Sequence, residues 1–150
     1  MKSRQHLYAI YRRIKNNCCD EWRTDTSSFY TWYEKQVDKQ KGLCEYCHLP
    51  GDTKEYYGKT FRQGRRGLTL EVDRKDNIEP YSPSNCVLAC YPCNNAKSDV
   101  FSYEEFLEIG RAISKVKLFG DLRHLHGLTT SLTCSSIPPA SDAVFCTSPK

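Results

Sequence analysis

The sequences CEYC at residues 44–47 and CYPC at residues 90–93 are two cysteine pairs with the same two-residue spacer. This spacer lets both sulfurs of a pair bind one ion, and four thiolates at about 2.3 Å complete the tetrahedral shell of Zn²⁺. We therefore predict that Cys44, Cys47, Cys90 and Cys93 form a structural zinc site. Two disulfides or four buried thiols are the alternative, which the absence of a secretory leader makes less favoured.

The composition predicts one small domain with a modest core. The chain has 150 residues, of which 27% are charged, and its mean hydropathy is −0.66. The formal net charge is +4, and residues 1–15 contain five basic residues and no acidic one. This end therefore either binds phosphates or forms a solvated helix face. Because no run of about 18 apolar residues occurs, we expect no membrane segment and an intracellular protein.

The chain divides into three predicted regions. Residues 1–41 form a basic, helical N-terminal region, and residues 42–120 hold both cysteine pairs. Residues 121–150 are rich in Ser, Thr, Pro and Ala and have no apolar periodicity. A segment of that composition cannot bury enough apolar surface to fold, so we expect a flexible, disordered tail.

Two helices are predicted before the first cysteine pair and a third after the second pair. Apolar residues recur at helical spacing in residues 4–16, and Ser27 or Ser28 can cap a second helix that follows. Ser102 and Glu105 form a capping box, in which each side chain bonds the backbone of the other at a helix start. The third helix is therefore expected to begin directly after Ser102.

A strand, a loop, a second strand and a helix are predicted between and after the cysteine pairs. Apolar and polar residues alternate over residues 68–73, the period of a half-buried strand, and Asp73 stands at the end of this strand. A turn-rich segment precedes a second apolar run at residues 87–89, and a helix is expected to start near Cys93. With the flanking helices, this order predicts an α+β fold.

Three runs of this region resemble the motif of the HNH endonucleases: VDRKDN at residues 72–77, YSPSNCVLAC at residues 81–90 and CNNAKSD at residues 93–99. The resemblance implies a ββα-metal, treble-clef-like nuclease domain. More narrowly, the chain resembles the PacI-like HNH restriction enzymes, through Asp73-Arg74, the YSP turn and FYTWY at residues 29–33. The resemblance implies a DNA endonuclease of restriction or homing type in a bacterial or phage-encoded, cytoplasmic protein.

The resemblance also implies three site residues. Asp73 and Asn94 correspond to the ligands of the catalytic metal, and their hard oxygen atoms suit Mg²⁺ or Mn²⁺. Such an ion neutralises charge on the phosphate and assists the leaving oxygen during phosphodiester hydrolysis. Asn85 corresponds to the middle asparagine of the motif, whose side chain bridges the loop backbone and orients the general base.

Arg74 stands where the family usually carries its general base, a histidine. A guanidinium stays protonated at any accessible pH, so Arg74 cannot take a proton from water. PacI-like enzymes share this arginine and use a tyrosine, and the residue that matches it here is Tyr33. The alternative is that Tyr33 is a core aromatic residue, while Arg74 clamps the phosphate and solvent or phosphate takes the proton.

Cations and aromatic rings alternate in residues 54–66, a composition that suits DNA, because cations bind phosphates and rings stack on bases. Lys97 follows Asn94 by three residues on the same helical face, so it is also expected to reach a phosphate. A solvated loop is the alternative for residues 54–66. The predicted DNA contacts are Lys54, Lys59, Arg62, Arg65, Arg66 and Lys97.

The expected partner is duplex DNA, and a homodimer would let two such sites cut both strands of a palindromic target. Two other functions stay open at this point. One is a zinc-dependent DNA-binding module derived from the HNH fold that has lost catalysis with the histidine. The other is a nuclease or binding protein for RNA.

Overall fold

The predicted α+β class is confirmed by the computed structural model, which describes residues 4–53 and 66–120. Helices precede a β-hairpin, and further helices follow it. Within the described residues, no helix has the length and apolar character needed to cross a membrane. The predicted tail at residues 121–150 lies outside the described part. The elements are α1 (Arg4–Ile14), the 3-10 helix η1 (Lys15–Asn17), α2 (Asp20–Thr24), α3 (Thr26–Lys39), β1 (Glu71–Arg74), β2 (Cys86–Ala89), α5 (Tyr91–Lys97) and α6 (Tyr103–Gly120).

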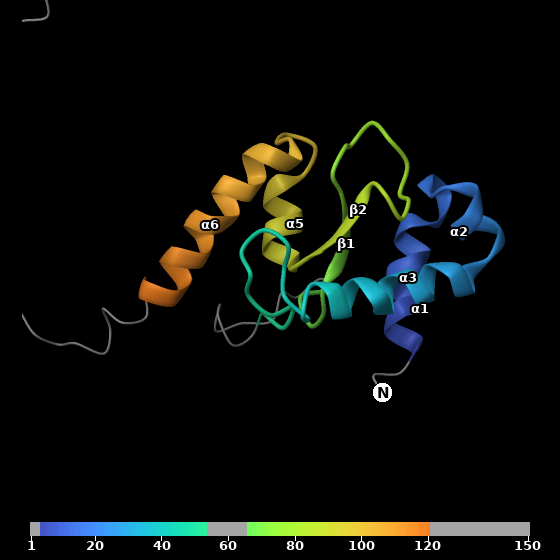
Figure 1. Ribbon diagram of the computed structural model, residues 1–150, viewed down its shortest axis with the longest axis horizontal. Helices are drawn as coiled ribbons and strands as arrows, with labels where there is room; N and C mark the ends of the chain where they lie inside the picture. Colours follow the sequence, from blue (N-terminus) through green and yellow to red (C-terminus); the bar gives the residue numbers. More distant parts are fainter. Residues whose placement is uncertain (1–3, 54–65, 121–150) are drawn as a thin grey trace, which may run out of the picture.

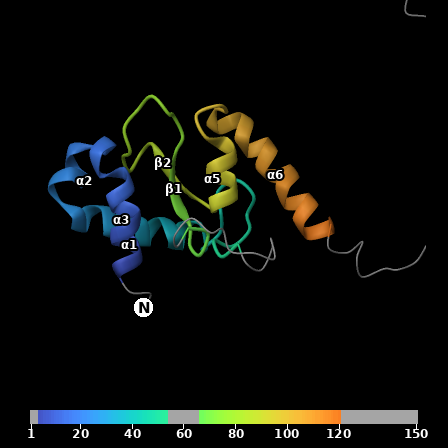
Figure 2. The same cartoon turned by 180° about the vertical axis from the view of Figure 1, so that it is seen from behind.

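The hairpin lies between two groups of helices (Figure 1). Helices α1, α2 and α3 cover one side of β1 and β2, and α5 and α6 lie on the other side, as the view from behind also shows (Figure 2). One cluster of buried residues includes side chains of α1, α3, both strands and the cysteine pairs. The core therefore extends across the predicted boundary at residue 41, and the division into regions stays a prediction.

The N-terminal helices follow the apolar pattern of the sequence with two differences. Leu7, Ile10 and Ile14 are buried on one face of α1, as the spacing predicts. Helix α3 begins before the predicted serine caps, because Asp25 accepts a 2.9 Å hydrogen bond from the backbone amide of Ser27. Helix α2 was not predicted, since five residues are too few to show a helical period.

The two strands pair antiparallel, with Glu71 opposite Ala89 and Asp73 opposite Val87. The alternation over residues 68–73 predicts a strand with Asp73 at its end, but β1 spans Glu71–Arg74, so it begins later than predicted and Asp73 lies inside the ladder. The difference arises because pairing with β2 sets the strand limits, and a partner strand cannot be read from local alternation. Helix α5 likewise starts at Tyr91, earlier than predicted.

The capping box of α6 is confirmed. The backbone amide of Ser102 donates to Glu105 Oε2 at 2.9 Å, and the amide of Glu105 donates to Ser102 Oγ at 3.2 Å. Further along this helix, Gly110 lies against the backbone of Tyr46, where a Cβ atom would be 2.5 Å from the carbonyl carbon and oxygen. Only glycine permits this approach, which brings α6 onto the first cysteine pair.

The residues that flank 54–65 are joined by hydrogen bonds to one carbonyl group. Both the backbone amide and the hydroxyl of Thr53 donate to the carbonyl oxygen of Gly67, each at 2.9 Å. Gly67 has a φ of 82°, a conformation that a residue with a Cβ rarely adopts. The chain is therefore held together on both sides of this segment immediately before β1.

Candidate active site

The two cysteine pairs converge into one buried cluster, as the spacing predicts. The four sulfur atoms lie within 4.8 Å of one another, and Cys47 Sγ is 3.7 Å from Cys90 Sγ. Four sulfurs bound tetrahedrally to zinc at about 2.3 Å would be about 3.8 Å apart, so this separation fits the ion. All four cysteines are free, which removes the disulfide alternative.

The hydrogen bonds among the four cysteine side chains are also consistent with a site for a cation. Hydrogen bonds from Cys47, Cys90 and Cys93 lower the pKa of Cys44. The hydrogen bond with the Cys44 sulfur raises the pKa of the Cys90 and Cys93 thiols. A divalent ion that binds thiolates would displace the protons that these hydrogen bonds hold between the sulfurs. Because Cys90 and Cys93 lie at the start of α5, the cluster fixes this helix to the first pair.

Asp73 points from β1 toward the side of the hairpin that α5 and α6 cover. Its Oδ2 accepts a 2.5 Å hydrogen bond from the hydroxyl of Tyr46 and lies 3.6 Å from the ammonium of Lys97. Burial raises the pKa of Asp73, and the Tyr46 hydrogen bond and the Lys97 charge oppose this shift. The carboxylate is therefore held in one orientation by a buried hydrogen-bond donor and a buried cation.

Glu71 lies two residues before Asp73 and so shares its face of β1. Arg66 donates to both oxygens of this carboxylate, from Nε at 2.9 Å and from Nη2 at 2.6 Å. Arg13 of α1 adds a contact of 3.4 Å, and Asn94 Nδ2 donates at 3.2 Å. The Glu71 side chain is only 5% exposed. Two guanidinium groups thus compensate a carboxylate that is almost removed from water.

Two residues of helix α5 contact two residues of strand β1 in the same order along the interface. Asn94 and Lys97 are three residues apart and therefore lie on one helical face, where Asn94 meets Glu71 and Lys97 meets Asp73. The predicted metal ligands Asp73 and Asn94 consequently belong to one β1–α5 interface. A carboxylate and an amide oxygen are donors that suit a hard divalent cation, so the residues of this interface fit Mg²⁺ or Mn²⁺.

The predicted role of Lys97 in DNA contact is wrong. Its side chain is fully buried, and its ammonium donates to the carbonyl of Arg74 at 2.8 Å. An ammonium enclosed in this way cannot reach a phosphate outside the protein. A charged residue on a short helix is usually solvated, but here the buried carboxylate of Asp73 supplies the compensating charge.

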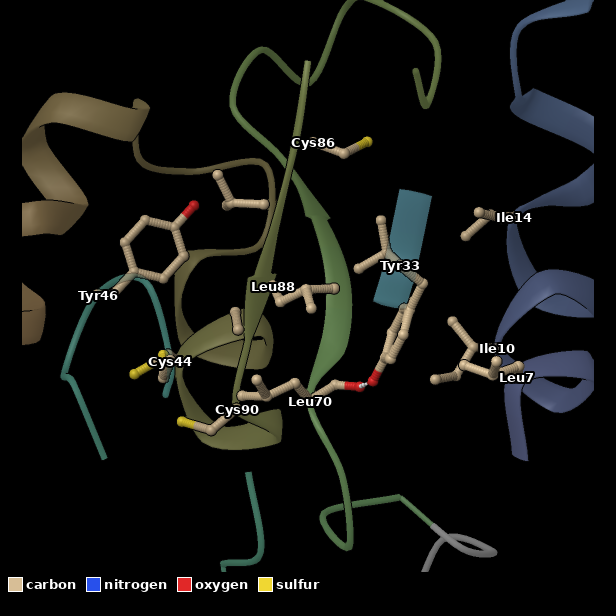
Figure 3. Close-up of a cluster of buried hydrophobic side chains, with 14 of the residues drawn as sticks. Leu7, Ile10, Ile14, Tyr33, Cys44, Tyr46, Leu70, Cys86, Leu88 and Cys90 are labelled. Carbon is tan, nitrogen blue, oxygen red and sulfur yellow. Dashed lines mark hydrogen bonds between the residues drawn. The ribbon is translucent and has the colours of Figure 1, made fainter. Parts of the chain in front are cut away.

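Tyr33 is packed on the other side of the hairpin from Tyr46 (Figure 3). Its hydroxyl donates to the carbonyl of Leu70 at 2.7 Å, and burial raises the pKa of the phenol. A buried phenol whose proton is bonded to a backbone carbonyl is a poor proton acceptor. The placement therefore favours the alternative reading of Tyr33 as a core aromatic residue.

Arg74 follows Asp73 and is the last residue of β1. Its guanidinium carbon lies 4.8 Å from the centre of the Tyr81 ring, and Nη1 donates to the carbonyl of Glu79 at 3.2 Å. Unlike the guanidinium of Arg66, this group has no carboxylate among these contacts. The stacked ring holds the cation at the end of the strand, where the loop to β2 begins.

Asn85 connects the two ends of the loop between β1 and β2. Its Oδ1 accepts from the amide of Asp76 at 2.9 Å, and its Nδ2 donates to the carbonyls of Asp76 at 2.9 Å and Pro80 at 3.1 Å. A single side chain thus satisfies several backbone groups that the loop would otherwise leave to water. This fixes the backbone that follows Arg74.

Among solved structures, the chain matches the rare-cutting HNH restriction endonuclease PacI with 31% sequence identity and a TM-score of 0.58. The match covers 78% of each of the two chains. The chain belongs to the HNH endonuclease family. No protein-family model and no curated protein matches it. The resemblance to HNH enzymes, and to PacI among them, is thereby confirmed.

Two residues that contact the predicted metal ligands of this HNH protein were not identified from the sequence. Glu71 has the same strand alternation as Asp73, so the two-residue step could have identified it. Tyr46 lies in the spacer of the first cysteine pair, where no periodic pattern indicates which way a side chain points. Of the predicted DNA contacts, Arg66 is paired with Glu71, and Lys54, Lys59, Arg62 and Arg65 lie outside the described residues.

Proposed function

We propose that the protein is a metal-dependent DNA endonuclease whose active site is the β1–α5 interface. The observation that carries this proposal is that Asp73 and Asn94 share that interface, beside a buried four-cysteine cluster. The family relationship supports it, since PacI is a restriction endonuclease with a mechanism of DNA perturbation. Duplex DNA is accordingly the proposed substrate, and hydrolysis of its phosphodiester bonds the proposed reaction.

Asp73 and Asn94 are the proposed ligands of Mg²⁺ or Mn²⁺. When bound, such an ion neutralises negative charge on the phosphate and assists departure of the leaving oxygen. The protein contributes orientation, because Tyr46 and Lys97 hold the Asp73 carboxylate from two directions. Fixing a ligand before substrate arrives lowers the entropy cost of reaching the reactive geometry.

Arg74 is the proposed phosphate clamp. Its planar guanidinium can donate two parallel hydrogen bonds to phosphate oxygens, and it cannot serve as a base. We do not retain Tyr33 as the base, because its hydroxyl is bonded to Leu70 within the core. Water or a phosphate oxygen then accepts the proton of the attacking water. Asn85 supports the clamp by fixing the loop that begins beside it.

The four-cysteine cluster is the proposed site of a structural Zn²⁺. It ties the start of α5, and with it Asn94, to the first cysteine pair, whose spacer residue Tyr46 binds Asp73. Lys54, Lys59, Arg62 and Arg65 remain proposed DNA contacts. A homodimer is proposed as well, because one site of this type cuts one strand.

Cleavage of a supercoiled plasmid tests the proposal. The zinc-loaded protein with Mg²⁺ or Mn²⁺ is expected to convert the plasmid to nicked or linear forms, and chelation should stop the reaction. Asp73→Ala is expected to abolish cleavage, whereas Asp38→Ala, which removes an exposed carboxylate on α3, should leave it intact. Cleavage that persists in a folded Asp73→Ala variant would contradict the proposed site.

A DNA-binding module without catalysis is the second candidate, and the presence of Arg74 at the position of the usual base favours it. This candidate predicts that the protein retards DNA in a gel but leaves the plasmid intact with every divalent metal. Single-stranded and structured RNA in the same assay tests the remaining possibility. Cleavage of RNA in preference to DNA would replace the proposed substrate.

A further inference from the structure

Glu71 determines which end of the Asn94 side chain faces the proposed metal site. A carboxylate can only accept hydrogen bonds, so the group of Asn94 that faces it at 3.2 Å must be the NH₂ donor. The carbonyl oxygen of the same amide then points away from Glu71. Only this oxygen can bind a metal ion, because an amide nitrogen has no free electron pair for coordination. The contact therefore selects the productive orientation of Asn94.

The backbone of Asn94 is already fixed. Its backbone amide donates to the carbonyl of Cys90 at 3.0 Å, within the first turn of α5, and the next residue before it is the cluster cysteine Cys93. Rotation of the terminal amide decides which end of this side chain faces Glu71, and the two ends are nearly equal in shape. A fixed partner is needed to distinguish them, and Glu71 is that partner.

Glu71 itself is poorly suited to bind the cation. Arg66 donates a hydrogen bond to each of its two oxygens, and Arg13 also donates to Oε1. Two guanidinium groups next to the carboxylate would repel a dication brought to the same oxygens. The same groups keep Glu71 in one position, and Arg66 is further held over the ring of Tyr91 at 4.4 Å.

We propose that Glu71 is a positioning residue that orients the amide of Asn94 so that its oxygen faces the metal. This inference rests on the proposed function, since it concerns the same ion. Carboxylates that accept a hydrogen bond from a metal ligand typically change metal affinity about 10- to 100-fold when they are removed. The effect passes entirely through Asn94, which makes it separable from a general loss of negative charge.

A double-mutant cycle on metal affinity tests the proposal without relying on cleavage. Mn²⁺ binding to the zinc-loaded protein, free of DNA, is measured from the electron paramagnetic resonance signal of unbound Mn²⁺. Glu71→Gln keeps the shape of the side chain but can present either a donor or an acceptor to Asn94. We expect about 10-fold weaker Mn²⁺ binding in Glu71→Gln. In an Asn94→Ala background, the same change should have no further effect.

Several results would overturn the proposal. Unchanged Mn²⁺ affinity in a folded Glu71→Gln variant is one. Another is that Glu71→Gln weakens Mn²⁺ binding equally in the wild-type and Asn94→Ala backgrounds, because this would indicate a long-range effect of charge. Should Glu71→Gln not fold, Glu71→Asp enters the same cycle, since it keeps the charge but withdraws the carboxylate from Asn94. The expected result is again a loss that requires Asn94.

The control separates this inference from the proposed function. Asp73→Ala should abolish the Mn²⁺ binding of the wild type. If the wild type binds no more Mn²⁺ than Asp73→Ala does, the proposed metal site fails, and the inference fails with it. If Asp73 is required and Glu71 is not, the metal site stands and only the role of Glu71 is refuted.

Discussion

The hydroxyl of Tyr46 donates a 2.5 Å hydrogen bond to the carboxylate of Asp73. This contact joins the spacer of the first cysteine pair to the proposed metal ligand. The Tyr46 ring is fully buried and packs edge-to-face against Phe106 of α6, with ring centroids 5.0 Å apart. The position of the carboxylate therefore depends on the cysteine cluster and on α6 as well as on the strand that carries it.

Tyr46→Phe is expected to reduce DNA cleavage by roughly 10- to 100-fold. The substitution keeps the packed ring but removes the donor, and an unpaired acceptor on a buried carboxylate costs about 1–3 kcal/mol. Asp73 would then turn toward Lys97. The measurement is the initial rate of plasmid nicking at saturating Mg²⁺, together with the thermal midpoint of each variant.

Tyr33→Phe is the matched control for this change. It removes a hydroxyl from the opposite side of the hairpin and leaves the carbonyl of Leu70 unpaired, so a loss of about 1–3 kcal/mol in stability is expected. Cleavage well below the thermal midpoint should stay near the wild-type rate. A folded Tyr33→Phe variant that cannot cut DNA would restore Tyr33 as the catalytic tyrosine.

Gly110→Ala should destabilise the protein, although alanine is more favourable than glycine inside a helix by about 1 kcal/mol. The added Cβ would lie 2.5 Å from the carbonyl of Tyr46, so α6 or the first cysteine pair must move. Overpacking of this kind typically costs about 1–3 kcal/mol. Urea unfolding measures the change. Lys115→Ala, at an exposed site of the same helix, should not lower stability.

Cys90→Ser is expected to abolish zinc binding and unfold the region from the first cysteine pair to α5. Structural zinc contributes about 10–16 kcal/mol in small zinc domains, comparable to the whole stability of a domain. Metal analysis and circular dichroism measure the loss. Cys86→Ser changes a buried cysteine of β2 outside the cluster, so that variant should retain its zinc. A folded, zinc-free Cys90→Ser protein would contradict the structural role of the ion.

Arg74→Ala is expected to weaken DNA binding for all sequences and to lower the salt dependence. Each phosphate contact adds about 0.9 to the slope of log K against log salt concentration on duplex DNA. The slope should therefore fall by about one. Fluorescence anisotropy at several salt concentrations measures it. Arg111→Ala removes an exposed arginine from α6 and serves as the control, and an equal change in both variants would argue against a specific clamp.

Local signals in the sequence predicted the elements that depend on neighbouring residues. The periodicity of Leu7, Ile10 and Ile14 indicated α1, and Ser102 with Glu105 marked the start of α6. The spacing of the cysteines identified their cluster because two-residue spacers constrain the sulfurs directly. The motif around Asp73 and Asn94 then led to the family, which the match to PacI confirms.

Contacts between distant segments could not be predicted in the same way. Lys97 is buried because Asp73, on another element, compensates its charge, and nothing near Lys97 in the sequence indicates this. The choice between Tyr33 and Tyr46 depends on which side of the hairpin each ring occupies. Pairing with β2 decides that β1 begins at Glu71 and continues to Arg74. Each of these outcomes is a property of the assembled fold rather than of a local pattern.

The paired hydrogen bonds from Thr53 to Gly67 give this scaffold a capacity for evolutionary change. They close the chain shortly before the strand that carries Asp73, so a mutation, deletion or insertion within residues 54–65 need not move this proposed metal ligand. Lengthening such a closed segment carries only a small entropic penalty. If residues 54–65 contact DNA as we propose, new target preferences can arise there by drift and selection while the proposed metal site is inherited intact.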